Sequence, residues 1–160
     1  MDGESAHSAR ASEKEVAMPF ETFEDAISAS HAATDRIMRG DAGGFKNLYS
    51  RRGDITLGNP FGGFGRGWDG VVEQLERAAS YFSDGRAVDF EQISKADGGE
   101  LAYTVEIERV AVKIAGGEEQ AEFAARVTSV YRREGDGWTL VHRHADPRVS
   151  RQTATSVLES

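Results

Sequence analysis

The chain has 160 residues, a formal net charge of −8 and no cysteine, and its sequence pI is about 5.0. This length fits one domain with a real core. The acidic balance argues against nucleic acid as a partner, because phosphate binding needs a basic surface, and disulfides and thiolate chemistry are excluded. No apolar run approaches membrane-spanning length, and the N-terminus, with Asp2 and Glu4, lacks the apolar segment of a signal peptide. We therefore expect a cytoplasmic protein with no membrane partner.

The first half of the chain predicts helices with one short strand. Residues 1–17 are rich in Ser, Ala and acidic side chains without an apolar period, which indicates a flexible N-terminal arm. Apolar residues at helical spacing predict a helix over residues 21–39, ended by Gly40. A short helix over 41–49 and a strand over 54–57 are expected to follow.

A glycine-rich loop over residues 58–67 leads into a third predicted helix, from Asp69 to about Phe82. The Asp69 carboxylate is expected to cap this helix by accepting hydrogen bonds from the unpaired first-turn amides. Gly85 is expected to end it.

Long strand-like segments separated by glycine turns fill the second half, and residues 148–160 form a Ser/Thr-rich tail that we expect to be flexible. The predicted strands are 87–96, 101–114, 119–133 and 138–145. This order of elements predicts an α+β fold in which the helices pack on one face of a bent antiparallel sheet.

Two turns define the expected faces of that sheet. A two-residue turn at Gly135-Asp136 places Arg126, Thr128 and Arg143 on one face. A turn at Gly116-Gly117 puts four residues of the preceding strand on that same face: Tyr103, Val105, Ile107 and Arg109. The same turn puts Glu106 and Glu108 on the opposite face, with Val127 and Ser129.

Two motifs resemble one family. The last hairpin reads Arg126-x-Thr128, then Gly-x-Gly-Trp-x-x-Val-His-x-His-x-Asp ending at Asp146. Upstream, the stretch GDITLGNPFGG over residues 53–63 precedes Gly67-Trp68. In this order the motifs resemble SnoaL-like proteins, relatives of ketosteroid isomerase in the NTF2-like superfamily, over roughly residues 20–147.

The resemblance implies an NTF2-like (cystatin-like) cone over residues 18–147, with the three helices of the first half packed on a strongly bent antiparallel sheet. It also implies a homodimer formed through the sheet face away from the pocket. Tyr131, Trp138 and His142 are the side chains we expect near that interface.

The arginine-bearing face is the predicted ligand site. Arg126, Thr128 and Arg143 share it with apolar neighbours, as a pocket for a small, partly apolar molecule requires. Two arginines favour an anionic or carbonyl-bearing ligand, because guanidinium offers paired donors. Asn59 and Tyr103 complete the predicted ligand contacts. The alternative is that the arginines lie at the sheet edge, bonded to acidic neighbours.

Two pairs are candidates for general acid–base catalysis. Glu106 and Glu108 share a strand face and would act as acid and base if burial separated their pKa values; alternatively they are solvated or bonded to arginines. His31 and Asp35 lie one helical turn apart, and the resemblance to dehydratase-like relatives implies a His–Asp dyad. The isomerase's base position corresponds to Asn59, whose amide takes up no proton.

Two further hypotheses concern cofactors. Residues 65–70 match G-x-G-x-x-G, as in dinucleotide sites, but the later strands are joined by hairpins rather than helices. His142, His144 and Asp146 alternate and would bind a metal from one strand face, or else serve hydrogen bonding. We expect no cofactor and no metal.

Three functions remain open at this stage. The first is a pocket protein that binds a small organic ligand. The second is an isomerase, cyclase or dehydratase, and the third is a non-catalytic dimerisation module whose pocket is vestigial.

Overall fold

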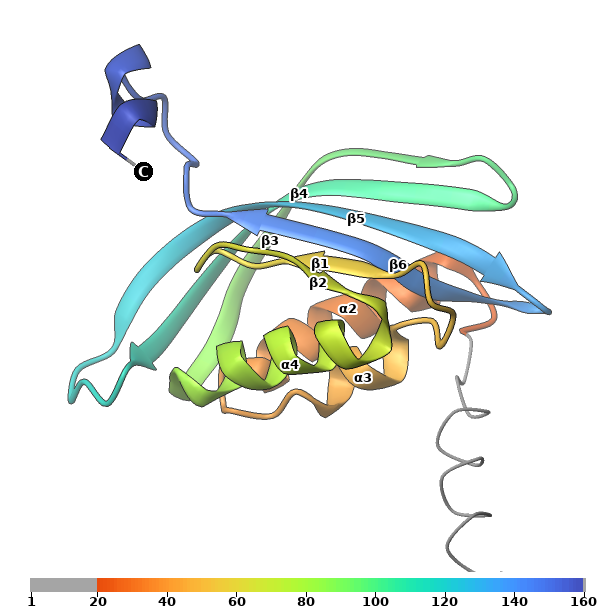
Figure 1. The fold of residues 1–160 in the computed structure, drawn as a ribbon, viewed down its shortest axis with the longest axis horizontal. Coiled ribbons are helices and arrows are strands. Elements are labelled where there is room, and N and C mark those ends of the chain that lie inside the picture. The colour runs from red at the N-terminus through yellow and green to blue at the C-terminus, as the bar shows by residue number, and fades with distance from the viewer. Residues whose placement is uncertain (1–19, 160) are drawn as a thin grey trace, which may run out of the picture.

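The computed structural model describes residues 20–159, so the predicted N-terminal arm lies outside the described residues. The elements are arranged as Figure 1 shows. The helices are α2 (Phe23–Ile37), α3 (Gly43–Leu48), α4 (Gly67–Ser80) and the 3-10 helix η1 (Ala154–Glu159). The strands are β1 (Thr56–Gly58), β2 (Gly65–Arg66), β3 (Phe82–Asp97), β4 (Leu101–Ile114), β5 (Ala121–Glu134) and β6 (Gly137–Asp146).

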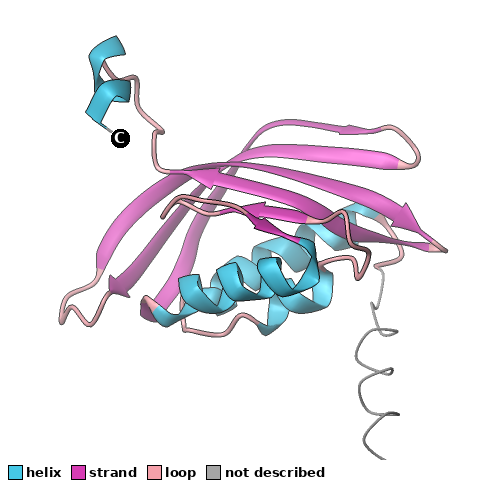
Figure 2. Cartoon of the chain, viewed as in Figure 1, coloured by secondary structure: helices cyan, strands magenta, loops and turns pink. Residues whose placement is uncertain are grey.

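The strands form one six-stranded sheet in the order β2-β1-β6-β5-β4-β3. All neighbours are antiparallel except β1 and β6, which run parallel. Figure 2 shows α2, α3 and α4 together on one side of the curved sheet. The predicted α+β architecture, with helices on one face of a bent sheet, is confirmed. We call the helix-covered face concave and the opposite face convex.

Helix α2 is defined by local signals at both ends. The Thr22 hydroxyl accepts a hydrogen bond from the Asp25 amide at 3.0 Å, which satisfies a first-turn donor. Phe23, Ile27 and Ile37 recur at helical spacing and are buried. The chain then turns at Gly40, whose φ of +83° suits glycine.

Helix α4 differs from the prediction at both ends. It begins at Gly67, so Asp69 lies in the first turn, and the N-cap residue is Arg66 without a side-chain cap. It ends at Ser80, and Gly85 belongs to strand β3 instead. A Cβ at Gly85 would lie 2.5 Å from Val112 Cγ2, so close packing against β4 is what this glycine permits.

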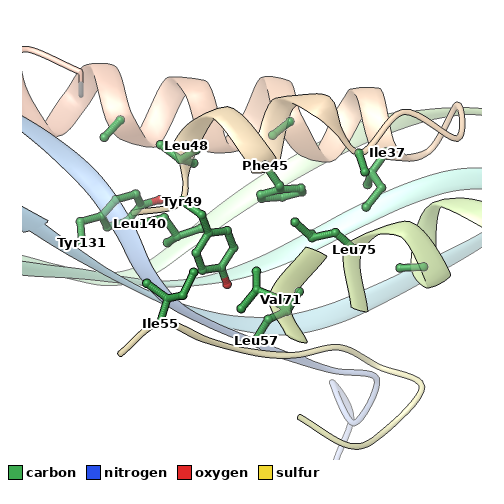
Figure 3. Close-up of a cluster of buried hydrophobic side chains, with 14 of the residues drawn as sticks. Ile37, Phe45, Leu48, Tyr49, Ile55, Leu57, Val71, Leu75, Tyr131 and Leu140 are labelled. Carbon is green, nitrogen blue, oxygen red and sulfur yellow. The ribbon is translucent and has the colours of Figure 1, made fainter. Parts of the chain in front are cut away.

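The core lies between the helices and the concave face, and Figure 3 shows part of it around Phe45, Tyr49 and Leu75. Tyr131 and Trp138 belong to this core, where their rings lie 5.5 and 5.6 Å from that of Phe23. Both side chains are 1% exposed. The expectation that they lie near a dimer interface is therefore wrong.

That error is one of facing, because the helices cover the sheet face that carries Tyr131 and Trp138. A second error, the placing of Arg143 with Arg126 and Thr128, is one of register. The β4–β5 pairing follows the prediction, with Glu106 opposite Val127. The β5–β6 pairing follows it only near the turn, because a bulge between Val130 and Tyr131 shifts the register. Beyond the bulge Arg143 pairs with Ser129 instead of Thr128. A one-residue shift reverses side-chain facing, so Arg143 lies on the concave face.

The tail after β6 ends in the short helix η1, which stands away from the sheet in Figure 1. Its Val157 and Leu158 side chains are exposed. Between residues 20 and 159, none of the helices has the length and apolar character needed to cross a membrane.

Candidate functional site

A cavity lies between the helices and the concave face of the sheet. Its empty volume is about 580 Å³, counted with its opening to solvent. Most of its wall is apolar. The lining side chains come from helices α2, α3 and α4, from β1 and the loop after it, and from β3 to β6. The lining residues are Ile37, Met38, Phe45, Leu57, Gly58, Asn59, Pro60, Phe61, Leu75, Ala78, Phe82, Glu108, Val110, Phe123, Ala125, Arg143 and Ala145.

The cavity wall carries one buried ion pair, between Glu108 of β4 and Arg143 of β6. Arg143 Nη1 donates to Glu108 Oε1 at 2.9 Å, and Nη2 donates to Oε2 at 2.7 Å. The two residues are only 4% and 8% exposed. Two parallel bonds of this length form the fork that guanidinium and carboxylate make best, so the pair is geometrically complete.

Neighbouring groups support this ion pair. The Arg143 guanidinium lies 4.8 Å from the centre of the Phe45 ring, a favourable cation–π arrangement. Thr34 of α2 donates to Glu108 Oε1 at 3.4 Å. Burial opposes the charge of Arg143, but Glu108, together with Tyr49 and Tyr131, more than offsets that effect, and the pKa of the guanidinium is raised above its ordinary value.

A second polar pair joins α2 to β4. His31 Nε2 lies 2.9 Å from both carboxylate oxygens of Glu106, and the imidazole stacks on Phe90 of β3 with ring centres 3.8 Å apart. An ionised carboxylate only accepts hydrogen bonds, so Nε2–H donates and Nδ1 is the basic nitrogen of the neutral ring. The side chain of His31 is 30% exposed and that of Glu106 is 7% exposed, so the pair has access to solvent through the imidazole.

The predicted pairing of His31 with Asp35 is wrong. Asp35 instead accepts hydrogen bonds from Arg39 Nη1 at 2.6 Å and from the Ala87 amide at 2.9 Å. These two bonds outweigh desolvation and lower the pKa of Asp35. Asp35 therefore ties α2 to β3, while the partner of His31 is Glu106.

Asn59 lies where the loop after β1 meets the cavity. Its Nδ2 donates to Gln74 Oε1 at 2.8 Å and its Oδ1 accepts from the Phe61 amide at 3.1 Å. The bond to Gln74 holds the loop against α4, and the bond from the Phe61 amide shapes the turn. Phe61 lines the cavity too and is 45% exposed, which places its ring at the opening.

Arg126, Thr128 and Tyr103 lie on the convex face, away from the cavity. Arg126 forms a two-bond ion pair with Asp146 at 3.0 Å for each contact, and Tyr103 is 39% exposed. The prediction that Arg126 and Thr128 share a face with Arg143 is wrong, because it assumed a β5–β6 register without the bulge. The cavity therefore contains one arginine of the predicted two.

The three residues of the metal hypothesis, His142, His144 and Asp146, also lie on the convex face. His142 Nδ1 is 2.7 Å from the Thr56 hydroxyl, and Asp146 is bonded to Arg126. Within the described part of the chain, no cluster of three or more His, Cys, Asp or Glu side chains is arranged to hold a metal ion.

The G-x-G-x-x-G stretch over residues 65–70 spans β2 and the start of α4. A Cβ at Gly65 would lie 2.3 Å from the Gly70 carbonyl oxygen. These glycines therefore permit close packing of β2 against the first turn of α4 within the protein. No helix connects β3 through β6, so the sheet lacks the repeated strand–helix–strand units of a dinucleotide fold.

Sequence reasoning named the ionisable members of the two concave-face pairs but missed their partners and part of the wall. No motif marks Thr34, Phe90 or Phe123 as a site residue, and Phe61 stands out only as part of the stretch over residues 53–63. One signal was available: Leu140 and Val141 are consecutive apolar residues, which breaks the strict alternation of a regular strand.

The SnoaL-like domain family model matches residues 24–147. The chain therefore belongs to the SnoaL-like family, as the hairpin and loop motifs predict. No curated protein matches the chain.

Solved structures show the same fold. An NTF2-like superfamily protein of Salmonella enterica serovar Typhimurium has a TM-score of 0.68 at 16% identity, covering 91% of this chain and 97% of that one. A candidate calcium/calmodulin-dependent protein kinase type II association domain of Thiobacillus denitrificans has 0.63 at 22%, covering 81% and 97%. A candidate dehydratase of the NTF2-like family from Streptomyces avermitilis has 0.62 at 20%, covering 78% and 92%. These likenesses, with the cystatin-like fold of a Caulobacter vibrioides protein, confirm the predicted NTF2-like (cystatin-like) fold.

Proposed function

We propose that this protein binds a small, largely apolar organic molecule in the cavity between the helices and the concave face. The main support is the composition of the cavity wall, in which apolar side chains from the helices and the sheet surround one buried ion pair, Glu108–Arg143. A concave apolar site with few convergent polar groups is the usual form of a small-molecule site. Of the predicted ligand contacts, Arg143 and Asn59 are the two that line the cavity.

Filling the cavity tests this proposal without breaking the ion pair. Ala125 of β5 lines the cavity, whereas its neighbour Ala124 has its side chain on the other face of the strand. The variant Ala125→Leu adds bulk to the site, and Ala124→Leu adds the same bulk outside it.

A thermal-shift screen of several hundred metabolites is run on both variants and the wild type. A ligand present at a hundred times its dissociation constant stabilises the folded state by about 2.7 kcal/mol. We expect hits that stabilise the wild type and Ala124→Leu but not Ala125→Leu. Hits that bind all three proteins equally, or no hit at all, would contradict a ligand site in this cavity.

A second candidate function is general acid–base catalysis by His31 and Glu106, as in the isomerase, cyclase or dehydratase alternative. The specific observation is an imidazole held by a carboxylate at 2.9 Å and stacked on Phe90, which orients the ring and leaves Nδ1 as the base. Such a group contributes about 10²–10⁴ to a rate.

His31 and Glu106 lie on the concave side but are not among the residues that line the cavity, so this candidate is tested by turnover of any ligand that the protein converts. We expect His31→Gln to lower kcat by about 10²–10⁴ with ligand affinity retained, and His144→Gln, on the convex face, to have no effect. Equal turnover by His31→Gln and the wild type would remove the pair from the mechanism.

The homodimer also remains a proposal. The convex face presents Tyr103, which is 39% exposed, beside the partly buried Val105, Ile107 and Val130, and apolar side chains gathered on one sheet face suit a subunit interface. Sedimentation velocity is expected to give a dimer for the wild type and a monomer for Ile107→Glu. A monomeric wild type would contradict the dimer; a dimer that no metabolite stabilises would favour the dimerisation-module alternative. The cytoplasmic location stays a prediction.

A further inference from the structure

We infer that the cavity selects ligands whose polar end is uncharged and carries a donor beside an acceptor, such as a primary amide, and that it discriminates against carboxylates. The inference rests on the proposed function and deepens it, because it names the chemical class of the ligand. Of the two expected ligand types, anionic or carbonyl-bearing, it keeps the carbonyl-bearing one and reverses the anionic one, which assumed two uncompensated arginines in the pocket.

The first support is the charge of the wall. Glu108 and Arg143 are the ionisable residues among those that line the cavity, and they are bonded to each other through the two terminal guanidinium nitrogens, Nη1 and Nη2. Their charges cancel within hydrogen-bond distance. A ligand carboxylate entering this site would lose its water without gaining a free cation, and it would lie near the carboxylate of Glu108.

The second support is the hydrogen-bonding capacity that the pair retains. A guanidinium has five N–H donors, and Glu108 takes one from each of two nitrogens. Each carboxylate oxygen has about two lone-pair sites; Oε2 accepts from Arg143 and Oε1 from Arg143 and Thr34. Donors of Arg143 and an acceptor site of Glu108 therefore remain side by side, and an amide C=O and N–H match such a pair.

The third support is the surroundings of the pair. Phe45 covers the Arg143 guanidinium, and Val110, Ala125 and Ala145 line the same part of the sheet. In such an apolar environment an unmatched charge is far more costly than a neutral polar group. The ion pair thus acts as a neutral, strongly dipolar recognition group.

Matched pairs of probes test the inference. Benzamide and benzoate differ in charge but hardly in shape, as do cyclohexanecarboxamide and its carboxylate, and phenylacetamide and phenylacetate. Dissociation constants are measured at neutral pH by calorimetry on the wild type, on Glu108→Gln and on the control Glu91→Gln, whose residue lies in an exposed ion pair with Arg109.

We expect at least one amide to bind the wild type about tenfold or more tightly than its carboxylate, the difference expected from about one charge-assisted hydrogen bond. Glu108→Gln leaves the Arg143 charge uncompensated, so the carboxylate is expected to gain relative to the amide and the ratio to reverse. Glu91→Gln is expected to keep the wild-type ratio.

The outcomes separate the two claims. A wild type that binds a carboxylate as tightly as its amide, while Ala125→Leu abolishes that binding, overturns the neutral-ligand inference and leaves the proposed function standing. Failure of every probe to bind any of the proteins overturns the inference, and a metabolite screen without hits then overturns the proposed function as well. The wild-type ratio decides the inference even if Glu108→Gln does not fold.

Discussion

Each face of the sheet carries an arginine–carboxylate ion pair with two bonds of similar length, and the two pairs lie in opposite environments. On the concave face Arg143 holds Glu108 through two bonds of 2.9 and 2.7 Å. On the convex face Arg126 holds Asp146 through two bonds of 3.0 Å. The side chains of the first pair are 10% and 5% exposed, and those of the second 56% and 27%.

Environment, rather than bond geometry, decides what each pair contributes. An exposed pair exchanges solvent contacts for protein contacts at little net gain, whereas a buried pair that loses one member leaves a charge without water or partner. The concave pair is therefore expected to be sensitive to truncation and to dominate ligand recognition. The convex pair is expected to tolerate change.

The largest expected effect comes from truncating the two arginines. Arg143→Ala leaves Glu108 buried and unpaired, and we expect it to lower the free energy of unfolding by about 3–5 kcal/mol. Arg126→Ala is expected to lower it by less than about 1 kcal/mol. Urea denaturation of the two variants measures the contrast. Similar losses of unfolding free energy would mean that the Glu108–Arg143 pair is not buried in solution.

The second comparison uses two glutamates on opposite faces of the sheet, Glu106 on the concave face and Glu91 on the convex face. Glu106→Gln removes the charge that holds His31, and we expect a loss of about 1–3 kcal/mol in the free energy of unfolding. Glu91→Gln, at the exposed pair with Arg109, is expected to leave denaturation unchanged. An unchanged free energy of unfolding in Glu106→Gln would show that the His31 contact is not maintained in solution.

The smallest expected effect is a pH dependence on the convex face. Burial, and then the neighbouring His144, lower the pKa of His142 below its ordinary 6.5. The folded state therefore binds fewer protons than the unfolded state below that value. The stability that His142 contributes is present above pH 6.5 and is lost as the pH falls toward and through the folded-state pKa.

The variant His142→Gln isolates this contribution, because His31 and His144 remain in both proteins. Thermal denaturation between pH 7.5 and 4.5 is expected to show a shallower loss of stability for the variant on the acid side. Parallel profiles for the two proteins would remove His142 as the cause.

The elements of the fold were accessible from sequence because their signals are local. Helical apolar spacing, the turn at Gly40 and the glycine turns between strands predict α2 and β4 to β6 to within a few residues, whereas β3 begins at Phe82, earlier than the predicted residue 87. The two-residue strand β2 carries no such signal and was missed. The Asp69 cap was misplaced because the positive φ of Gly67, +67°, lets the chain enter α4 earlier.

The site was only half predictable, because it depends on register over long sequence separations. The β4–β5 register followed from its turn and correctly placed Glu106 and Glu108 on one face. The bulge beside Val130 then moved Arg143 to that face, and no turn residue encodes a bulge at that distance. The sequence therefore identified the ionisable groups of both concave pairs, and the pairing of Arg143 with Glu108 emerged only in three dimensions.

The most direct test of this account is a double-mutant cycle on Glu108 and Arg143, with Glu108→Gln, Arg143→Met and the combined variant measured by urea denaturation. We predict that each single change is strongly destabilising and that the combined loss is smaller than the sum by at least about 1 kcal/mol, since contacting groups couple by about 0.5–3 kcal/mol and the combined variant leaves no buried charge without its partner. Additive losses would contradict the account, because they would mean that Arg143 and Glu108 do not meet inside the cavity.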